Sequence, residues 1–182
     1  MIRRIAPAFL RPPLFMLLLV AMLAPTLAGC ALQPLYAGGR GGAVASTLSS
    51  VSVAPVAGET GWLVHNALVD KLSASGSSET RYRIDVRLED SIAGFGVRAD
   101  DSVTRERRTL RARWQLVDTV SGATVIDATA VSDSGIDAVG SEYATIAAER
   151  TAIEQLSDAV ADQIIARVAV YARNQAAQPG AR

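Results

Sequence analysis

Hydrophobic and polar residues alternate without a break in residues 81–89. Every second side chain is apolar and the others are charged, which is the pattern of a β-strand that buries one face. Residues 105–117 repeat the pattern, and Trp114 falls in the apolar register with Leu110 and Leu116. We therefore predict two long strands that share one core, with Trp114 inside it.

A third strand is expected directly after the second long one. In residues 124–132 every second position is apolar, with Ile126, Ala128 and Ala130 on one face. The Ser121-Gly122 pair just before them is typical of a tight turn. The second and third strands are therefore predicted to form a hairpin.

Two further segments complete the predicted sheet and its connections. Val51 and Val53 alternate with serines and end at Pro55, which suits a short strand near a sheet edge. Residues 92–101 contain two glycines around Phe95 and are predicted to be the loop between the long strands. A mobile exposed tip is the other interpretation of this segment.

Two segments show the three-to-four-residue spacing of amphipathic helices. In residues 61–74 the repeating apolar positions are Val64, Leu68 and Leu72, and Thr60 is the expected N-cap. A second helix is predicted from Ser141 to about residue 174. Its recurring apolar residues are Tyr143, Ile146, Ile153, Val160, Ile164, Val168 and Tyr171.

The predicted order of elements is β-α-β-β-β-α, which is an α+β fold. It gives a single mixed sheet of about four strands with two helices packed on one face. The opposite face is left to solvent or to a partner. We place this domain at residues 48–175, after a flexible glycine-rich tether at 30–47 and before a disordered tail at 176–182.

The first 29 residues have the composition of an export signal. Residues 1–11 carry three arginines and no acid, and the apolar run from Leu14 to Leu27 follows them. This run is about 14 residues long, shorter than the roughly 20 that a membrane-spanning helix needs. We therefore predict a signal peptide at residues 1–29 that is removed by cleavage.

The sequence Leu27-Ala28-Gly29-Cys30 resembles a lipobox, the site at which bacterial lipoproteins are cleaved and acylated on cysteine. Cys30 is the only cysteine of the chain, so an internal disulfide is excluded. A buried or reactive thiol is the other interpretation. We predict that several acyl chains on Cys30 anchor the domain to a membrane, because each buried CH₂ group contributes about 0.8 kcal/mol.

The charge of the chain argues against a nucleic-acid-binding protein. The full sequence balances 18 basic residues with 18 acidic ones. Loss of the signal peptide removes three arginines, so the mature chain has 15 basic residues against 18 acidic ones and is slightly acidic. Domains that bind nucleic acid usually carry a net positive charge or a basic patch.

The polar registers of the two long strands are rich in arginine. If these strands are neighbours, their arginines form one surface, diluted by Asp85, Glu89 and Asp127. Guanidinium groups bind phosphate and carboxylate, so this arginine face is a candidate site for an anionic lipid headgroup or an acidic partner. The other interpretation is that the arginines pair with acids across strands and keep the sheet soluble. The candidate residues are Arg81, Arg83, Arg87, Arg105, Arg107, Arg111 and Arg113.

The sequence contains no recognisable catalytic set. It has no Gly-x-Ser-x-Gly motif and no glycine-rich phosphate loop. His65 is the only histidine, so it lacks the further ligands that a metal site needs. Trp62 fits either a packing role or a ligand-stacking role. We expect no enzyme activity, no cofactor and no metal site.

Several segments together resemble the LptE family of lipopolysaccharide-assembly lipoproteins of Gram-negative bacteria, in its alphaproteobacterial form. The resemblance covers nearly the whole chain after the signal peptide. The pair Ala31-Leu32 departs from the Gly-Phe pair associated with that position, which affects only the N-terminal signature. The matching segments are Gly29-Cys30, Pro34-Leu35-Tyr36, Asn66-Ala67-Leu68-Val69-Asp70-Lys71-Leu72, Tyr82-Arg83-Ile84-Asp85-Val86, Trp114-Gln115-Leu116-Val117-Asp118, Tyr143-Ala144 and Ala148-Glu149-Arg150.

The resemblance implies a non-catalytic lipoprotein on the periplasmic side of the outer membrane. Such a protein sits as a plug inside the LptD β-barrel, helps the barrel to fold and helps to deliver lipopolysaccharide to the outer leaflet. The expected partners are therefore an LptD-type barrel, the membrane through the lipid anchor and lipopolysaccharide itself. Outer-membrane sorting is also implied, because Ala31 stands where inner-membrane lipoproteins usually carry aspartate.

Two other functions are compatible with the same pattern. An accessory lipoprotein of another envelope lipid-transport system, or an activator of a cell-wall enzyme, could use a similar α+β domain. Copurification with a barrel or with an inner-membrane ATPase separates these possibilities. An enzyme acting on envelope lipids or glycans would require a pair of carboxylates in a pocket.

Overall fold

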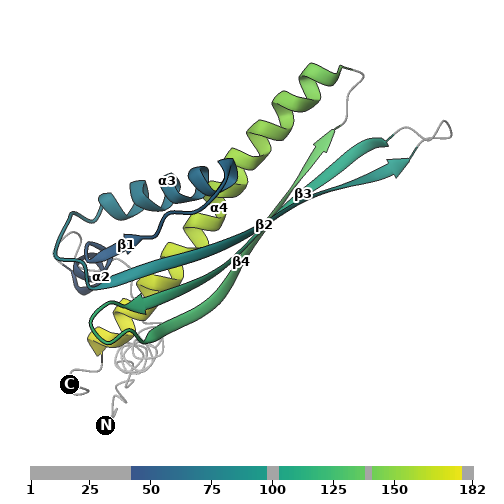
Figure 1. Cartoon of the computed structure of the whole chain (residues 1–182). Coiled ribbons are helices and arrows are strands. Elements are labelled where there is room, and N and C mark those ends of the chain that lie inside the picture. Colours follow the sequence, from purple (N-terminus) through teal and green to yellow (C-terminus); the bar gives the residue numbers. More distant parts are fainter. Residues whose placement is uncertain (1–41, 98–102, 138–140, 178–182) are drawn as a thin grey trace, which may run out of the picture. The chain divides into compact units, whose positions relative to one another are not determined.

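The computed structural model describes residues 42–97, 103–137 and 141–177, which form an α+β unit (Figure 1). The predicted strands and the two predicted helices are all present, and one further helix precedes them. The elements are α2 (Ala43–Leu48), β1 (Val51–Val53), α3 (Glu59–Ser73), β2 (Tyr82–Val97), β3 (Val103–Asp118), β4 (Thr124–Asp137) and α4 (Glu142–Ala177).

The four strands form one sheet in the order β1-β2-β3-β4. β1 runs parallel to β2, with Val51 opposite Tyr82, and α3 lies in the crossover between them. β2, β3 and β4 are antiparallel neighbours. The sheet is therefore mixed, as predicted. Its connections fit this arrangement, because parallel neighbours need a crossover such as α3 whereas antiparallel neighbours need only a turn.

The core lies between the sheet and the helices α3 and α4. The apolar registers of β2 and β3 point into it, since Ile84, Leu110 and Leu116 have no exposed surface and Trp114 is 2% exposed. This burial confirms the prediction for Trp114. The helices contribute residues that are also fully buried, namely Val64, Leu68, Val160, Ile164 and Val168.

The additional helix α2 corrects the predicted extent of the tether, which reached residue 47. Val44 and Leu48 of α2 are buried in the same core as the residues of α4. A helix of six residues is too short to be stable alone, so it forms because it packs against the rest of the domain. The domain therefore already includes Ala43.

The long hairpin extends further than predicted. Residues 92–97, predicted as loop, continue β2, and Gly94 lies opposite Glu106 of β3. The hydrogen bonds between strands join backbone groups, which glycine also has. The glycines therefore weaken the strand without ending it. Residues 98–102 lie outside the described part of the chain. β4 is also longer than predicted and ends at Asp137.

The N-terminal turns of α4 correct the predicted core. Tyr143 is 84% exposed and Ile146 is 56% exposed, whereas Ile153 and Val160 are buried. The spacing of these residues is correct for a helix, but the helix begins before the part that packs on the sheet. Periodicity identifies a helix face, and only the neighbouring elements decide how much of that face is covered.

The start of α3 also differs from the prediction. Gly58 occupies the N-cap position with φ of 85°, a backbone conformation that favours glycine. Thr60, the predicted cap, instead donates its hydroxyl hydrogen bond to Asp90 Oδ2 at 3.3 Å. His65 Nδ1 lies 3.3 Å from the carbonyl oxygen of Ala54. Trp62 is 62% exposed, so it has no core role.

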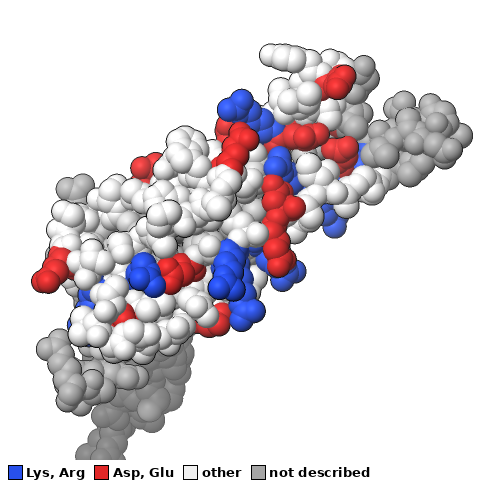
Figure 2. All heavy atoms as spheres, in the orientation of Figure 1, with Lys and Arg blue, Asp and Glu red and all other residues white. Residues whose placement is uncertain are grey.

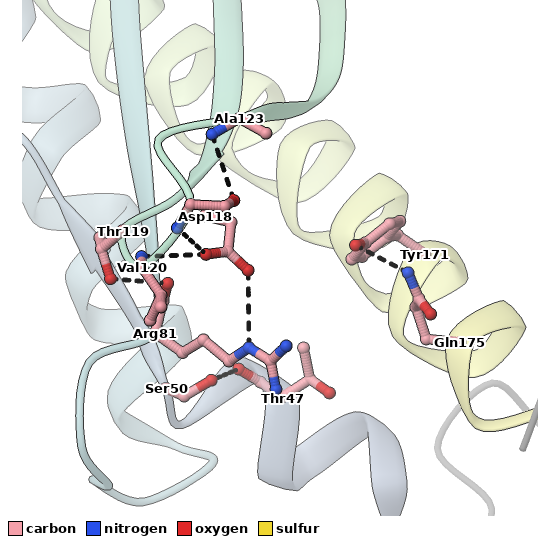
Figure 3. A network of polar contacts seen from close by, with 10 residues as sticks. Thr47, Ser50, Arg81, Asp118, Thr119, Val120, Ala123, Tyr171 and Gln175 are labelled. Atoms are coloured by element: carbon pink, nitrogen blue, oxygen red, sulfur yellow. Dashed lines mark hydrogen bonds and ion pairs between the residues drawn. The ribbon is translucent and has the colours of Figure 1, made fainter. Parts of the chain in front are cut away.

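Asp118 fixes the turn between β3 and β4 (Figure 3). Its Oδ1 accepts hydrogen bonds from the backbone N–H groups of Val120 at 2.9 Å and Ser121 at 3.0 Å. Its Oδ2 lies 3.6 Å from Arg81 Nε. The hydrogen bond from the Ser121 backbone is the largest cause that holds the pKa of Asp118 below its ordinary value. The turn predicted here is confirmed, and a carboxylate stabilises it.

Candidate functional site: the arginine face

The antiparallel pairing of β2 and β3 brings the candidate arginines onto one surface. Arg87 lies opposite Arg113, and Glu89 lies opposite Arg111. These positions have the parity opposite to that of the buried residues, so they belong to the face that α3 and α4 leave uncovered. The seven predicted arginines therefore lie along one exposed surface, spread over the length of the β2–β3 ribbon.

Six of these arginines lie beside a carboxylate. Acids of β2 and β4 flank the arginines of β3 on both sides, and charges of both signs also mingle on the side of the molecule shown in Figure 2. The pairs and their N···O distances are Arg81–Asp118 at 3.6 Å, Arg83–Asp85 at 2.8 Å, Arg105–Asp137 at 3.1 Å, Arg107–Asp133 at 3.8 Å, Arg111–Glu89 at 3.8 Å and Arg113–Asp127 at 3.4 Å.

Arg87 is the exception among the seven. No ion pair or hydrogen bond joins its side chain to another residue in the described ranges, and its cross-strand neighbour Arg113 has the same charge. Like charges placed directly opposite each other on a sheet repel. The unbalanced positive charge of the arginine face is therefore centred on Arg87.

The pairs on this face contribute little to stability. Arg113 is 68% exposed and Asp127 is 42% exposed, and water and dissolved salt screen the attraction between charges exposed to this extent. The pKa of Asp127 is lowered, first by the hydrogen bond from the Gln115 amide at 2.9 Å and then by Arg113. This face is therefore a solvated surface on which the positive and negative charges nearly balance.

A second polar cluster lies on the helix-facing side of the sheet, where the sequence did not lead us to expect one. Arg108 binds Asp90 through Nη2 at 2.6 Å and Nε at 3.0 Å. Its Nη1 donates to the carbonyl oxygen of Glu149 in α4 at 3.1 Å. The alternation of β3 could have predicted this cluster, because Arg108 lies two residues before Leu110 and so has its side chain on the same, helix-facing side of the strand.

The contact between Arg108 and Asp90 shifts the pKa of both groups. The side chain of Arg108 is 15% exposed and that of Asp90 is 24% exposed. The hydrogen bonds from Arg108 are the main cause that lowers the pKa of Asp90, and the same contact raises the pKa of Arg108. Within the described ranges, Oε2 of nearby Glu106 is buried and has no hydrogen-bond partner. This cluster ties the sheet to both α3 and α4.

Other predicted features can be placed only in part. Cys30 lies outside the described residues. In the part of the chain that is described, no three side chains of the types that ligate metals gather into a site. In the same ranges, no helix has the length and apolarity needed to cross a membrane.

Several solved structures share this fold. A lipoprotein structure from Caulobacter crescentus CB15 has a TM-score of 0.60 and 26% identity, covering 74% of this chain and 98% of that one. A minor lipoprotein from Acinetobacter baumannii has a TM-score of 0.56 and 14% identity, covering 68% and 92%. The rare lipoprotein B from Shewanella oneidensis has a TM-score of 0.50 and 14% identity, covering 70% and 97%. At 14% identity the last two show the fold alone.

The family is identified by sequence. A comparison with curated proteins gives no significant match. Residues 48–168, more than half of the chain, match the family model LptE, described as lipopolysaccharide-assembly. This match confirms the resemblance noted from the sequence, and it covers α3, α4 as far as Val168 and the whole sheet. The chain therefore belongs to the LptE lipopolysaccharide-assembly family.

Proposed function

We propose that this chain is an outer-membrane lipoprotein that plugs an LptD-type β-barrel and helps to assemble it. In this role it assists the delivery of lipopolysaccharide to the outer leaflet and performs no catalysis. The observation that carries the proposal is the family match over residues 48–168. The experiment that tests it is isolation of the acylated chain from solubilised outer membranes, followed by identification of the proteins that remain bound.

The dimensions and polarity of the sheet support a position inside a barrel. β2 and β3 have 16 residues each, which corresponds to a ribbon of roughly 50 Å. The apolar band of an outer-membrane barrel is about 25 Å tall, and the interior of such a barrel is polar. A long sheet with a balanced, charged outer face can therefore extend through a polar lumen.

Cys30 supplies the anchor in this proposal. After removal of residues 1–29, the segment 31–42 would connect the acylated cysteine to α2. Twelve residues of glycine-rich coil reach about 20 Å, which keeps the domain close to the inner surface of the outer membrane. Ala31 after the cysteine agrees with outer-membrane sorting.

An accessory role in another envelope system is the alternative. It would be supported by recovery of an inner-membrane ATPase, and not a barrel, in the isolation experiment. The family match favours the lipopolysaccharide pathway over this alternative.

We further propose that the arginine face contacts phosphate groups of lipopolysaccharide, with Arg87 as the principal contact. Six of the seven arginines already have a carboxylate neighbour, so a ligand phosphate would compete with that carboxylate. Arg87 has no such competitor within the described ranges. Substitution of Arg87 by glutamate is therefore expected to weaken capture of the detergent-solubilised, acylated chain on immobilised lipopolysaccharide by about fivefold.

Matched controls separate this contact from general electrostatics. Arg150→Glu removes the same charge from the exposed surface of α4, where Arg150 lies 3.8 Å from Glu154. Arg150→Glu should leave capture on lipopolysaccharide unchanged within experimental error. The double variant Arg107→Glu/Arg111→Glu should lose more capture than Arg150→Glu and less than Arg87→Glu. Equal losses in Arg87→Glu and Arg150→Glu would remove the arginine face as the site of contact.

A further inference from the structure

β4 has an open edge. It is the last strand of the sheet, and no strand of the described residues pairs with its outer side. In an antiparallel pair, the backbone N–H and C=O groups of alternate residues point away from the neighbouring strand. The backbone groups of Val131 point outward, because they bond to Gln163 of α4. Every second residue of β4, counted from Val131, has the same orientation.

Gln163 of α4 caps this edge at one residue. Its Nε2 donates to the carbonyl oxygen of Val131 at 3.0 Å, and its Oε1 accepts from the Val131 N–H at 3.2 Å. A side-chain amide thus makes the two bonds that a neighbouring strand would make. By alternation, the backbone groups of Asp127 and Thr129 also face outward, and no hydrogen bond of those backbone groups to another side chain is present in the described ranges.

A hollow of about 680 Å³ lies between this edge and α4. α4 runs beside β4 in Figure 1 and supplies one wall, while the open strand edge supplies the other. Arg167 lines the hollow and has no carboxylate or hydrogen-bond partner in the described ranges. The remaining lining residues are Trp114, Asp127, Ala128, Thr129, Ala130, Gln163, Ala166 and Val170.

We propose that this hollow receives an extended polypeptide segment of a partner, which adds a short strand along Asp127–Thr129 of β4. An acyl chain would fill the space but leave the outward backbone groups of β4 unpaired, whereas a polypeptide pairs with them. Arg167 selects a segment that carries a carboxylate. This site is on the sheet edge, so it goes beyond the proposed function, which concerns the arginine face and the barrel.

The cap at Val131 sets the length of the added strand. Gln163 occupies the place where the incoming chain would continue past Thr129. The segment therefore pairs with Asp127–Thr129 of β4 and ends at Gln163. Side chains at alternate positions of the segment would lie beside Ala128 and Ala130, which line the hollow together with Trp114.

The test uses a fluorescein-labelled peptide of seven residues, with threonine and valine in alternation and one central glutamate. Its binding to the full acylated chain in detergent is followed by fluorescence anisotropy. Thr129→Pro removes one outward N–H without removing a bond to β3, and Arg167→Glu reverses the selecting charge. Each is expected to weaken binding by about fivefold, the effect of one lost hydrogen bond or charge contact.

Two controls keep the outcome independent of folding defects. Asp133→Pro makes the same change beyond the Gln163 cap, so it should bind the peptide as the unmodified chain does. A peptide N-methylated on every residue has no backbone N–H to donate from either edge of its strand and should not bind, although the protein is unchanged. Absence of binding to the unmodified chain, equal binding of the N-methylated peptide, or equal loss in Asp133→Pro and Thr129→Pro would each overturn the proposal.

Discussion

Substitution of Asp90 by alanine is expected to lower the free energy of unfolding by about 3 kcal/mol. The change leaves the guanidinium of Arg108, which is 15% exposed, without the carboxylate that binds it at 2.6 and 3.0 Å. A largely buried charge without a partner is strongly destabilising. Urea unfolding of the acylated chain, followed by tryptophan fluorescence, measures the loss.

The double variant Asp90→Leu/Arg108→Leu serves as the control. Replacement of both partners by apolar residues removes the ion pair without leaving a buried charge, so most of the lost stability should return. If the double variant were as unstable as Asp90→Ala, the loss would come from packing and not from the unpaired arginine.

The same pair predicts a dependence on pH. The hydrogen bonds from Arg108 lower the pKa of Asp90 in the folded chain below its ordinary value of 3.8. A carboxyl of this kind stabilises the fold above its unfolded pKa and loses that contribution as the pH falls through the folded pKa. The stability difference between the unmodified chain and Asp90→Ala should therefore be constant above pH of about 5 and shrink in more acidic solution.

Substitution of Ile164 by alanine is expected to cost about 3 to 4 kcal/mol. Ile164 has no exposed surface, and it lies in α4 within the core shared with α3 and the sheet. The deletion removes three methyl or methylene groups and leaves a cavity that the neighbouring side chains fill only in part. The midpoint of urea unfolding should fall with little change in slope.

Ile146→Ala is the matched control for this prediction. It makes the same chemical change on the same helix, but Ile146 is 56% exposed. Its effect should remain within about 0.5 kcal/mol. A large loss for Ile146→Ala would mean that the N-terminal turns of α4 pack against the domain more closely than the structure shows.

The sequence determined the strands well because each strand lies between two different environments. Strict alternation in residues 81–89 and 109–116 reflects a sheet with helices on one side and solvent on the other. A shift by one residue would expose the whole apolar set, so the register and the burial of Trp114 could be read from the pattern.

Features that depend on neighbouring elements could not be predicted in the same way. α2 forms because Val44 and Leu48 pack into the core of the domain. Its six residues are too few to show a clear helical period of hydrophobic positions. Tyr143 and Ile146 fit the helical period but lie beyond the covering sheet. In both cases the sequence pattern is local, whereas the amount of burial depends on tertiary packing.

The candidate site was predicted as a surface but not as a set of contacts. Parity placed the seven arginines on one face, and their grouping follows from the pairing of β2 with β3. Which arginine lacks an acid could not be predicted, because Asp133 and Asp137 of β4 lie in a part of the strand that was not expected. Arg87 and Arg167 became distinctive only once the acids around the other arginines had been located.

Isolation of the acylated chain from solubilised outer membranes tests the proposed function most directly. The chain is captured through a C-terminal tag, washed stringently and analysed by mass spectrometry, with a Cys30→Ala chain as the unanchored control. The account predicts recovery of a large LptD-type β-barrel in near-equal amount, reduced in the control. Recovery of inner-membrane transport proteins alone, or of no partner, would contradict it.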